Sequence, residues 1–242
     1  MSGAMLIADT LSASYGAARI LYDLSFEVGR GEVVALMGRN GAGKSTTMRA
    51  IMGLIDERAG TVRFNGENIS RLKPFEIARR GLGYTPEDRR IFSDLTVMEN
   101  LDVGRQPPRV FADGRPAPAW TPQKLFALFP NLAEMPDRLG GRMSGGEQQM
   151  LTVARTLMGN PLLVLLDEPS EGVAPLIVEQ MAATIVELKK VGLSILLSEQ
   201  NLHFARLVAD RAYVLEQGQI RWQGTMRQLD TDLDVQKAYL TV

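Results

Sequence analysis

A glycine-rich segment near the start of the chain, residues 38–46 (GRNGAGKST), constrains the fold more than any other part of the sequence. It fits the pattern G-x-x-x-x-G-K-[ST], in which glycines let the backbone curl so that successive N–H groups point at a polyphosphate. The apolar run 33–37 before it predicts a buried strand, and residues 44–52 predict a helix whose N-terminus adds partial positive charge. This strand–loop–helix order predicts an α/β protein that binds a nucleotide.

The residues of this loop have separate expected roles. Lys44 would place a full positive charge on the β- and γ-phosphates, and the Ser45 hydroxyl is placed to ligate Mg²⁺. The other expected nucleotide contacts are Gly38, Asn40, Gly41, Gly43 and Thr46. A glycine-rich turn with a surface lysine is the alternative, and the strand and helix predicted on either side make it the less favoured one.

Composition limits the remaining classes of protein. A chain of 242 residues is long enough for one or at most two domains with a full core. The net charge is −1 and there is no basic block, which argues against a binder of duplex nucleic acid. The sequence has no cysteine, no signal peptide and no apolar run of about 18 residues. We therefore expect a cytosolic chain that reaches a membrane only through another subunit.

The N-terminal third predicts mostly antiparallel strands. Residues 6–15 and 20–28 alternate apolar and polar side chains, as half-buried strands do. Residues 61–64 and 67–69 flank Asn65-Gly66 and predict a hairpin. A short helix at 74–80, with proline in its first turn, and a short strand at 82–84 complete this part.

Between residues 87 and 159 the pattern is helical. Helical spacing occurs at 95–103 and 123–129, separated by a proline-rich loop whose length predicts mobility or a functional role. No strand pattern occurs in this stretch. We therefore predict one domain, 1–242, in which a helical subdomain at 87–159 interrupts an α/β core formed by 1–86 and 160–242.

The core resumes with consecutive aliphatic residues at 162–166, which predict a strand buried on both faces of a parallel sheet. The remaining predictions are helices at 175–190 and 200–209, a strand at 193–198, a hairpin at 211–216 and 219–222, and two short C-terminal helices. The predicted fold class is α/β, with a P-loop NTPase (RecA-like) core, an antiparallel β subdomain and an inserted helical subdomain.

Two carboxylates, Asp167 and Glu168, directly follow the aliphatic strand. In doubly wound sheets ligands bind at the carboxyl ends of strands, so this position favours a catalytic role over that of a surface pair of acids. We expect Asp167 to hold Mg²⁺ directly or through water, and Glu168 to be the base that orients an attacking water.

A second candidate anion site begins at Ser144 and continues through Gly145, Gly146 and Glu147. Serine followed three residues later by glutamate is a capping box, which by itself would explain the segment as the start of a helix at 148–158. Two glycines in a first helical turn also leave backbone N–H groups exposed, and such donors bind anions.

Together these segments resemble the ATP-binding cassette (ABC) ATPases. The loop at 38–46 resembles the family's Walker A motif, residues 143–148 (MSGGEQ) its signature and residues 165–169 (LLDEP) its Walker B motif. The resemblance covers essentially the whole chain. It implies a head-to-tail dimer in which each ATP lies between one chain's Walker A and the other chain's signature. It also implies that Tyr15 stacks on adenine and that residues 170–173 run between subunits.

Two positions depart from the family pattern. Glu87 stands after Tyr84-Thr85-Pro86, where the family usually has glutamine, and Gln200 stands where it usually has histidine. We expect Glu87 and Gln200 to act in catalysis beside the γ-phosphate, and Glu87 also to be a ligand on the metal side. The only histidine, His203, is expected on a helix surface, with a phosphate contact as the alternative.

These departures and residues 170–175 (SEGVAP) resemble the smaller ATPase of branched-chain amino-acid importers. The resemblance implies ATP and Mg²⁺ as cofactors and a peripheral place on the cytoplasmic side of the inner membrane. It implies transmembrane permease subunits, a second and different ABC ATPase subunit and, indirectly, a solute-binding protein as partners, and no nucleic acid. Arg89, Arg90, Ile91 and Phe92 are candidate contacts with the permease, unless they form an ordinary amphipathic loop.

Three alternatives remain at this point. Relatives that move urea, amides or other small carboxylates share these short motifs. A soluble ABC ATPase acting on nucleic acid or the ribosome would need a coiled-coil insertion or a second Walker A, and neither is found here. A P-loop kinase or GTPase would leave the signature segment unexplained.

Overall fold

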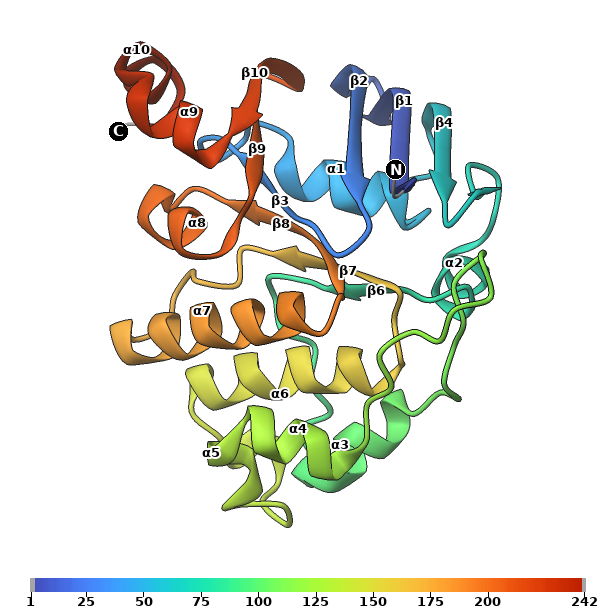
Figure 1. Ribbon diagram of the computed structural model, residues 1–242, viewed down its shortest axis with the longest axis vertical. Helices are drawn as coiled ribbons and strands as arrows, with labels where there is room; N and C mark the ends of the chain where they lie inside the picture. Colours follow the sequence, from blue (N-terminus) through green and yellow to red (C-terminus); the bar gives the residue numbers. More distant parts are fainter. Residues whose placement is uncertain (1–2, 241–242) are drawn as a thin grey trace.

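The computed structural model describes residues 3–240, whose strands form two sheets (Figure 1). The first sheet is antiparallel and has the strand order β2-β1-β4-β5. Its members are β1 (Ala4–Tyr15), β2 (Ala18–Gly29), β4 (Arg58–Phe64) and β5 (Glu67–Asn68). The predicted strands and hairpin are confirmed. β1 and β2 are longer than predicted because their pairing continues beyond the alternating stretches, from Ala4 opposite Gly29 to Tyr15 opposite Ala18.

The second sheet forms the centre of the molecule and has the order β10-β9-β3-β8-β7-β6. Its members are β3 (Val33–Met37), β6 (Leu82–Thr85), β7 (Leu163–Asp167), β8 (Ser194–Glu199), β9 (Arg211–Glu216) and β10 (Gln219–Thr225). All neighbours in this sheet are parallel except β10, which pairs antiparallel with β9. The α/β fold class with an antiparallel β subdomain is confirmed.

Helices cover both faces of the central sheet. They are α1 (Lys44–Ile51), α2 (Pro74–Arg79), α3 (Val97–Gly104), α4 (Pro122–Leu128), α5 (Pro130–Ala133), α6 (Gly145–Met158), α7 (Pro175–Lys190), α8 (Leu202–Val208), α9 (Met226–Thr231) and α10 (Leu233–Val235). A 3₁₀ turn at Gly140–Arg142 and a π turn at Gln236–Leu240 add to them. The sequence missed α5 and the 3₁₀ turn, which are too short to show a period. Within residues 3–240 no helix has the length and apolar character that crossing a membrane requires.

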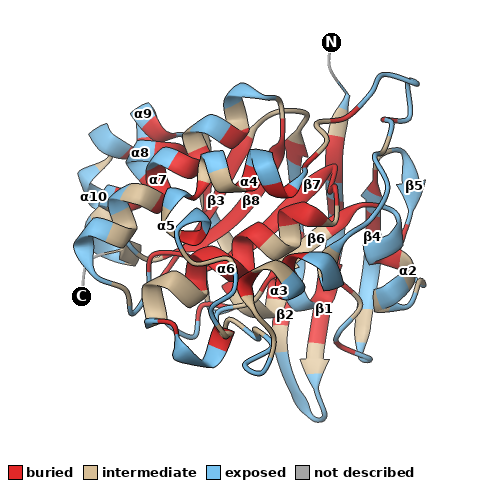
Figure 2. Ribbon diagram, turned by 90° about the horizontal axis from the view of Figure 1, so that it is seen from below, coloured by how far each residue is buried: buried red, intermediate tan, exposed pale blue. Residues whose placement is uncertain are grey.

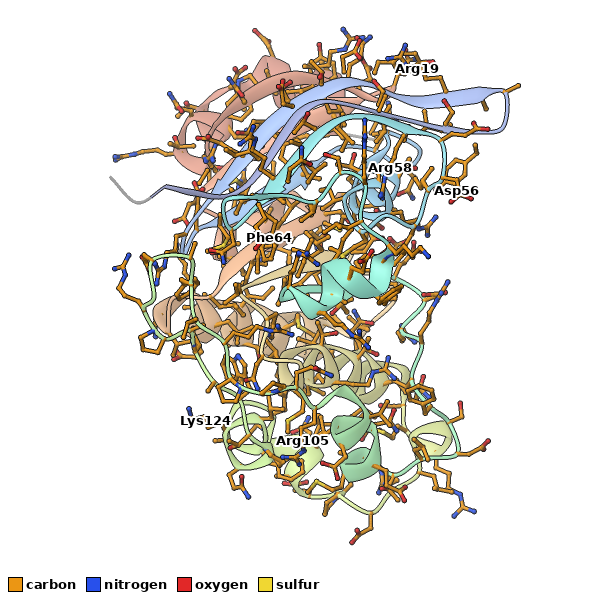
Figure 3. All side chains as sticks on the ribbon, turned by 90° about the vertical axis from the view of Figure 1, so that its right-hand side faces the viewer. Arg19, Asp56, Arg58, Phe64, Arg105 and Lys124 are labelled. Atoms are coloured by element: carbon orange, nitrogen blue, oxygen red, sulfur yellow. The ribbon has the colours of Figure 1, made fainter. Side chains whose placement is uncertain are left out.

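Each of the strands β3, β7, β8 and β9 contributes to two separate hydrophobic clusters because both of its faces are buried (Figure 2). On β3, Val33, Ala35 and Met37 belong to the cluster of the helical subdomain, which also includes α7 and α8, whereas Val34 and Leu36 belong to the cluster of the antiparallel sheet. Phe64, labelled in Figure 3, belongs to the second cluster. The unbroken aliphatic runs in the sequence follow from this two-sided burial.

The proline-rich loop, which we call the strap (residues 105–121), runs from α3 across the molecule and back to α4 (Figure 1). Asn160 closes its base: the side-chain amide donates to Gln106 O at 2.6 Å, and Oδ1 accepts from Trp120 N at 2.6 Å. Asn160 is 3% exposed and has a φ of 48°. One buried side chain therefore holds both ends of the strap beside the turn between α6 and β7.

The tip of the strap is attached to the core. Phe111 is buried, with the Arg30 guanidinium 3.4 Å from the centre of its ring. Ala112 N donates to Asn65 Oδ1 at 3.1 Å, and Arg30 pairs with Asp113 at 2.6 Å. The expected mobility is thus opposed by specific contacts. The division of the chain at 87–159 remains a prediction, because the tip packs in the cluster of the antiparallel sheet.

We predict that Asn160→Ala destabilises the fold by about 3 kcal/mol. The substitution leaves the buried Trp120 N–H and the partly buried Gln106 O without their side-chain partner, and it keeps a side chain at positive φ. Asn160→Gly removes the same hydrogen bonds but relieves the backbone, so its loss should be smaller by about 1 kcal/mol. Urea unfolding of the three proteins measures the difference. Equal stability of Asn160→Ala and the wild type would contradict the role of Asn160.

Candidate nucleotide-binding and hydrolysis site

The glycine-rich loop connects β3 to α1, as predicted, and its shape depends on glycine. Gly43 has a φ of 107°, and a Cβ there would lie 2.9 Å from Leu21 Cδ2. A Cβ on Gly38 would lie 2.5 Å from Leu215 O. No side chain caps α1, so the N–H groups of its first turn are available to an anion.

Lys44 projects from the first residue of α1 and is 3% exposed. Its ammonium donates to Gly38 O at 2.8 Å and to Arg39 O at 3.2 Å. It also pairs with Glu168 Oε1 at 3.0 Å. A polyphosphate bound at this loop would therefore compete with Glu168 for the same ammonium group.

Asp167, at the end of β7, is fully buried and accepts three hydroxyl groups. Oδ1 accepts from Ser45 at 2.9 Å and from Ser198 at 2.6 Å, and Oδ2 accepts from Tyr84 at 3.1 Å. Burial, followed by the charge of Asp167, raises the pKa of Tyr84. A hydroxyl and a carboxylate this close fit Mg²⁺, which prefers hard oxygen ligands.

Glu168 has a φ of 49°, a conformation that costs a residue with a side chain about 1 kcal/mol. Its backbone N–H, at 3.2 Å from Ser198 O and 3.1 Å from Ser198 Oγ, is tied to β8. Ser198 therefore orients both predicted acids at once. Sequence reasoning missed Ser198 and Tyr84, although each stands near the end of a predicted central strand.

A third buried acid, Glu199, ends β8 and is 1% exposed. One carboxylate oxygen accepts from Ser170 N at 3.2 Å and the other from Asn201 N at 3.1 Å. Burial raises the pKa of Glu199, and the charge of Glu168 adds to the increase. Glu199 was not among the predicted site residues.

Gln200 and Glu87, the two positions that depart from the family pattern, differ in their contacts. Gln200 donates from Nε2 to Glu171 Oε2 at 3.3 Å, so it is directed at residues 170–173 of its own chain. Glu87 is exposed, and within residues 3–240 it makes no hydrogen bond or ion pair. His203 is exposed on α8, as expected for a helix-surface residue. The roles of Glu87 and Gln200 stay predictions.

The signature segment forms the predicted capping box at the start of α6. Ser144 Oγ accepts from Glu147 N at 3.3 Å, and Glu147 Oε2 accepts from Ser144 N at 2.7 Å. Added Cβ atoms on Gly145 and Gly146 would lie 2.8 Å from Arg89 Nη1 and 2.7 Å from Ile177. Close packing against Ile177 thus favours glycine at 146, whereas at 145 the flexible end of Arg89 can move aside.

The loop helix and the signature helix lie on opposite faces of the central sheet. Met48 and Ile51 of α1 belong to the cluster of the antiparallel sheet, whereas Leu151 and Val153 of α6 belong to the cluster of the helical subdomain. Figure 1 shows the central strands between the two helices. The structure therefore gives no indication that the two candidate phosphate sites meet within one chain.

Tyr15 ends β1 and is 46% exposed, as a platform for a base would be. Its hydroxyl lies beside Arg49 of α1, and this contact, with a further one from Tyr84, raises the pKa of Arg49. Arg49 therefore connects the expected adenine platform to the tyrosine on Asp167. Nothing in the sequence pattern singled it out.

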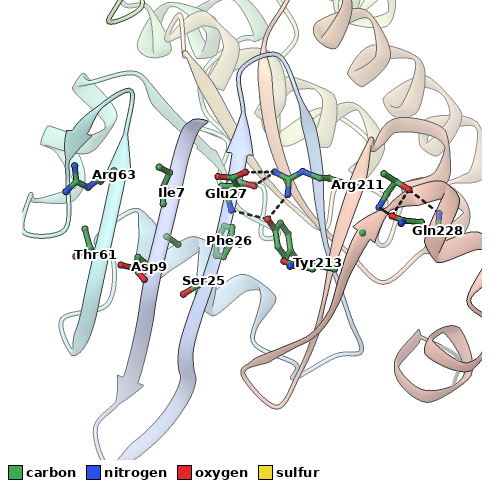
Figure 4. Close-up of a pocket in the computed structure, with 14 residues that line it drawn as sticks. Ile7, Asp9, Ser25, Phe26, Glu27, Thr61, Arg63, Arg211, Tyr213 and Gln228 are labelled. Atoms are coloured by element: carbon green, nitrogen blue, oxygen red, sulfur yellow. Dashed lines mark hydrogen bonds and ion pairs between the residues drawn. The ribbon is translucent and has the colours of Figure 1, made fainter. Parts of the chain in front are cut away.

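A groove of about 780 Å³ lies elsewhere, between the antiparallel sheet and the β9–β10 hairpin (Figure 4). Arg211 and Tyr213 meet there, with Arg211 Nη1 donating to the tyrosine hydroxyl at 2.6 Å. None of the predicted site residues lines this groove. Although this groove is large, we do not assign catalysis to it, because the predicted catalytic residues lie elsewhere.

Comparison with known proteins agrees with the geometry. A sequence profile described as ABC transporter matches residues 21–171. The chain belongs to the ABC transporter family. It is accordingly an ABC-type ATPase, and the loop at 38–46 and the acids at the end of β7 are the segments predicted to be its Walker A and Walker B motifs.

Two kinds of curated relative match nearly the whole chain. The high-affinity branched-chain amino acid transport ATP-binding protein BraG of Pseudomonas aeruginosa is 43% identical over 236 residues, covering 98% of this chain and 99% of BraG. The lipopolysaccharide export system ATP-binding protein LptB of Haemophilus influenzae is 36% identical over 244 residues, covering 98% and 97%. A nucleotide-free ATP-binding cassette from an ABC transporter has a similar structure, with a TM-score of 0.79, 28% identity and 96% coverage of each chain.

We predict that Glu199→Gln changes the pH dependence of stability. The pKa of Glu199 is higher in the folded state than in the unfolded state. This carboxyl therefore destabilises the folded protein least at low pH, where it is protonated in both the folded and the unfolded chain. The stability then falls as pH rises past the carboxyl's ordinary pKa toward the folded-state value. Glutamine cannot ionise, so the melting temperature of the variant relative to wild type should improve as pH rises above about 4.3, the ordinary pKa of the carboxyl. Thermal unfolding below and above this pH tests it, with the exposed Glu57→Gln as control; a pH-independent difference would contradict it.

Proposed function

We propose that this ABC ATPase powers uptake of branched-chain amino acids or chemically similar small solutes. The observation that carries the proposal is the 43% identity with BraG across nearly the full length of both chains. The similarity to LptB supports the alternative of lipopolysaccharide export. Uptake of urea, amides or other small carboxylates is a further alternative, because importers of these solutes share the same short motifs.

In the proposed hydrolysis, Lys44 and the N–H groups of the Walker A loop hold the β- and γ-phosphates, and Tyr15 stacks on adenine. Ser45 and Asp167, with Glu87 on the same side, hold Mg²⁺, which when bound neutralises phosphate charge. Glu168 leaves its ion pair with Lys44 and orients the attacking water. Gln200 leaves Glu171 and donates neutral hydrogen bonds to the γ-phosphate.

The proposed active form is a head-to-tail dimer in which Walker A of one chain faces Ser144 and its neighbours on the other. The placement of α1 and α6 on opposite faces of the central sheet supports it, because one chain alone does not bring the two anion sites together. The departures at Glu87 and Gln200 favour a heterodimer with a second ATPase that carries the usual residues.

A groove of about 520 Å³ offers the permease a docking site. It lies between α2, β6 and α3, and its exposed apolar side chains are Leu54, Phe75, Phe92 and Val103. Arg79 and Arg155 also line it, and none of the carboxylates in residues 3–240 does. We propose that a cytoplasmic helix of a permease subunit docks here with an apolar face and an acidic side chain. The location that goes with this proposal is the cytoplasmic face of the inner membrane.

Of the four residues expected at this contact, Phe92 lines the groove. Arg90 contacts a residue of the groove through its backbone oxygen, which accepts a hydrogen bond from Arg155 at 2.6 Å. Arg89 instead points to α6 and residue 172, because Nε donates to Gln149 at 3.3 Å and Nη2 to Gly172 O at 3.4 Å. Its contacts favour a role in connecting the signature helix with residues 170–173.

The test of the proposal is reconstitution with the permease subunits encoded beside this chain. Proteoliposomes should show ATP-dependent uptake of labelled leucine when the matching solute-binding protein is supplied. Extraction of lipopolysaccharide in place of leucine uptake would replace the importer by the exporter. Full uptake with this chain as the only ATPase would overturn the heterodimer.

We predict that Glu168→Gln slows phosphate release at least about 100-fold, because general-base catalysis contributes roughly 10²–10⁴. Since the variant also loses the competing ion pair with Lys44, its affinity for ATP should equal or exceed that of the wild type. Phosphate-release assays and binding of a fluorescent ATP analogue measure the two effects, with the exposed Glu134→Gln as control. Unchanged turnover would assign the base elsewhere.

We predict that Phe75→Asp and Val103→Asp prevent co-purification with the permease without reducing ATP affinity of the isolated subunit. Each change puts a charge on an exposed apolar wall of the groove. Leu233→Asp is the matched control, since Leu233 is as exposed but lies on α10. Normal assembly of both groove variants would refute the docking site.

We predict that Gln200→His introduces an ionisation into the pH–rate profile between about pH 6 and 8, because histidine titrates there and glutamine does not. A profile that stays flat in the variant would remove position 200 from the γ-phosphate. If His203→Ala abolished a neutral-pH ionisation of the wild type, His203 would be the phosphate contact instead.

A further inference from the structure

A second concave site lies at the N-terminal ends of the central strands, and the Walker A loop lies at their opposite, C-terminal ends. It is a depression of about 630 Å³ between the strap and two core turns, one at Gly31 before β3 and one at Gly192 before β8. β3 and β8 run parallel, so both turns lie at the strands' N-terminal ends. The length of β3 separates this depression from the nucleotide loop by about 15 Å.

The lining is positively charged. Arg30 from the core, Arg115 from the strap and Lys124 from α4 line the depression, and among residues 3–240 no carboxylate does. Asp113, just outside the lining, pairs with both arginines. Hydrogen bonds from Arg115, and then from Arg30, keep the pKa of Asp113 below its usual range. The three cations thus have one carboxylate beside them, and within the described part of the chain the ammonium of Lys124 donates to a backbone oxygen, Ala119 O, at 2.7 Å.

The remaining walls are apolar. They consist of Pro116, Ala117, Pro118, Ala119, Trp120 and Val191. Trp120 is 9% exposed and belongs to the cluster of the helical subdomain, so its ring is a firm wall. A strongly hydrated ion such as free phosphate would gain nothing from these side chains, whereas an anion with an apolar body would bury it against them.

We propose that this depression binds a small organic carboxylate with an apolar body. The cations receive the carboxylate. Arg115 already donates from Nε and Nη2 to Asp113, so it offers the ligand the remaining N–H groups of its Nη1–Nη2 edge, beside the ammonium of Lys124. The apolar part lies against the prolines and Trp120. Such a ligand would connect the strap and α4 to the core without competing with ATP, and the inference is independent of which solute the transporter moves.

The probe is phenylacetate, with phenylacetamide as a ligand of the same shape without charge. Equilibrium dialysis of labelled phenylacetate against the full chain should show one saturable site, unaffected by saturating ADP. Phenylacetamide should compete at least tenfold more weakly. Equal competition by phenylacetamide, displacement by ADP, or displacement by inorganic phosphate at the same concentration as phenylacetate would overturn the proposal.

Two independent variants locate the site. Arg115→Gln combined with Lys124→Gln should raise the Kd for phenylacetate at least tenfold, since two charge-assisted hydrogen bonds are lost. Val191→Glu should do the same by adding a negative charge at an exposed edge of the depression, without touching the strap. Arg227→Gln, an exposed arginine on α9, controls for net charge and should change the Kd less than twofold. A Kd within twofold of wild type in both site variants would refute the proposal.

Discussion

One buried carboxylate, Asp167, organises the catalytic end of the molecule. It is fully buried, and it is stabilised because hydroxyl groups from α1, β6 and β8 all donate to it. These three bonds fix the end of β7 relative to the Walker A helix and to both neighbouring strands. The position of Glu168, and through it the ion pair with Lys44, depends on the same connection.

The charges at this end of the sheet have two possible arrangements. Lys44 can pair with Glu168, as in the structure, or with a bound phosphate. In the structure the lysine is paired with Glu168, the acid that we propose orients the attacking water. In that proposal a nucleotide that took over Lys44 would set Glu168 free, so nucleotide binding and release of the base would be one exchange of partners for the same ammonium. The left-handed backbone of Glu168 is maintained by its bonds to Ser198, which keep the acid near this position.

The helical subdomain is joined to the core by more than its two chain connections. Asn160 holds the base of the strap, and Phe111 and Asp113 hold its tip against the antiparallel sheet and the turn before β3. The strap therefore extends from the helical subdomain, which carries the signature segment, to the end of the central sheet opposite the Walker A loop. This arrangement creates the basic depression, because its charges come from the strap, from α4 and from the core.

The sequence by itself determined the order of strands and helices, the Walker A loop with Lys44 and Ser45, the acids Asp167 and Glu168, and the capping box at Ser144. All of these are local: a glycine spacing, a run of aliphatics or a cap acts within a few residues, so it is visible in the chain. The tertiary structure alone decided which hydroxyls meet Asp167, that Ser198 orients Glu168, that Glu199 is buried and that the strap is attached by Asn160. Those contacts join residues far apart in the chain, and no local pattern encodes them because they arise only when the sheet brings its strand ends together.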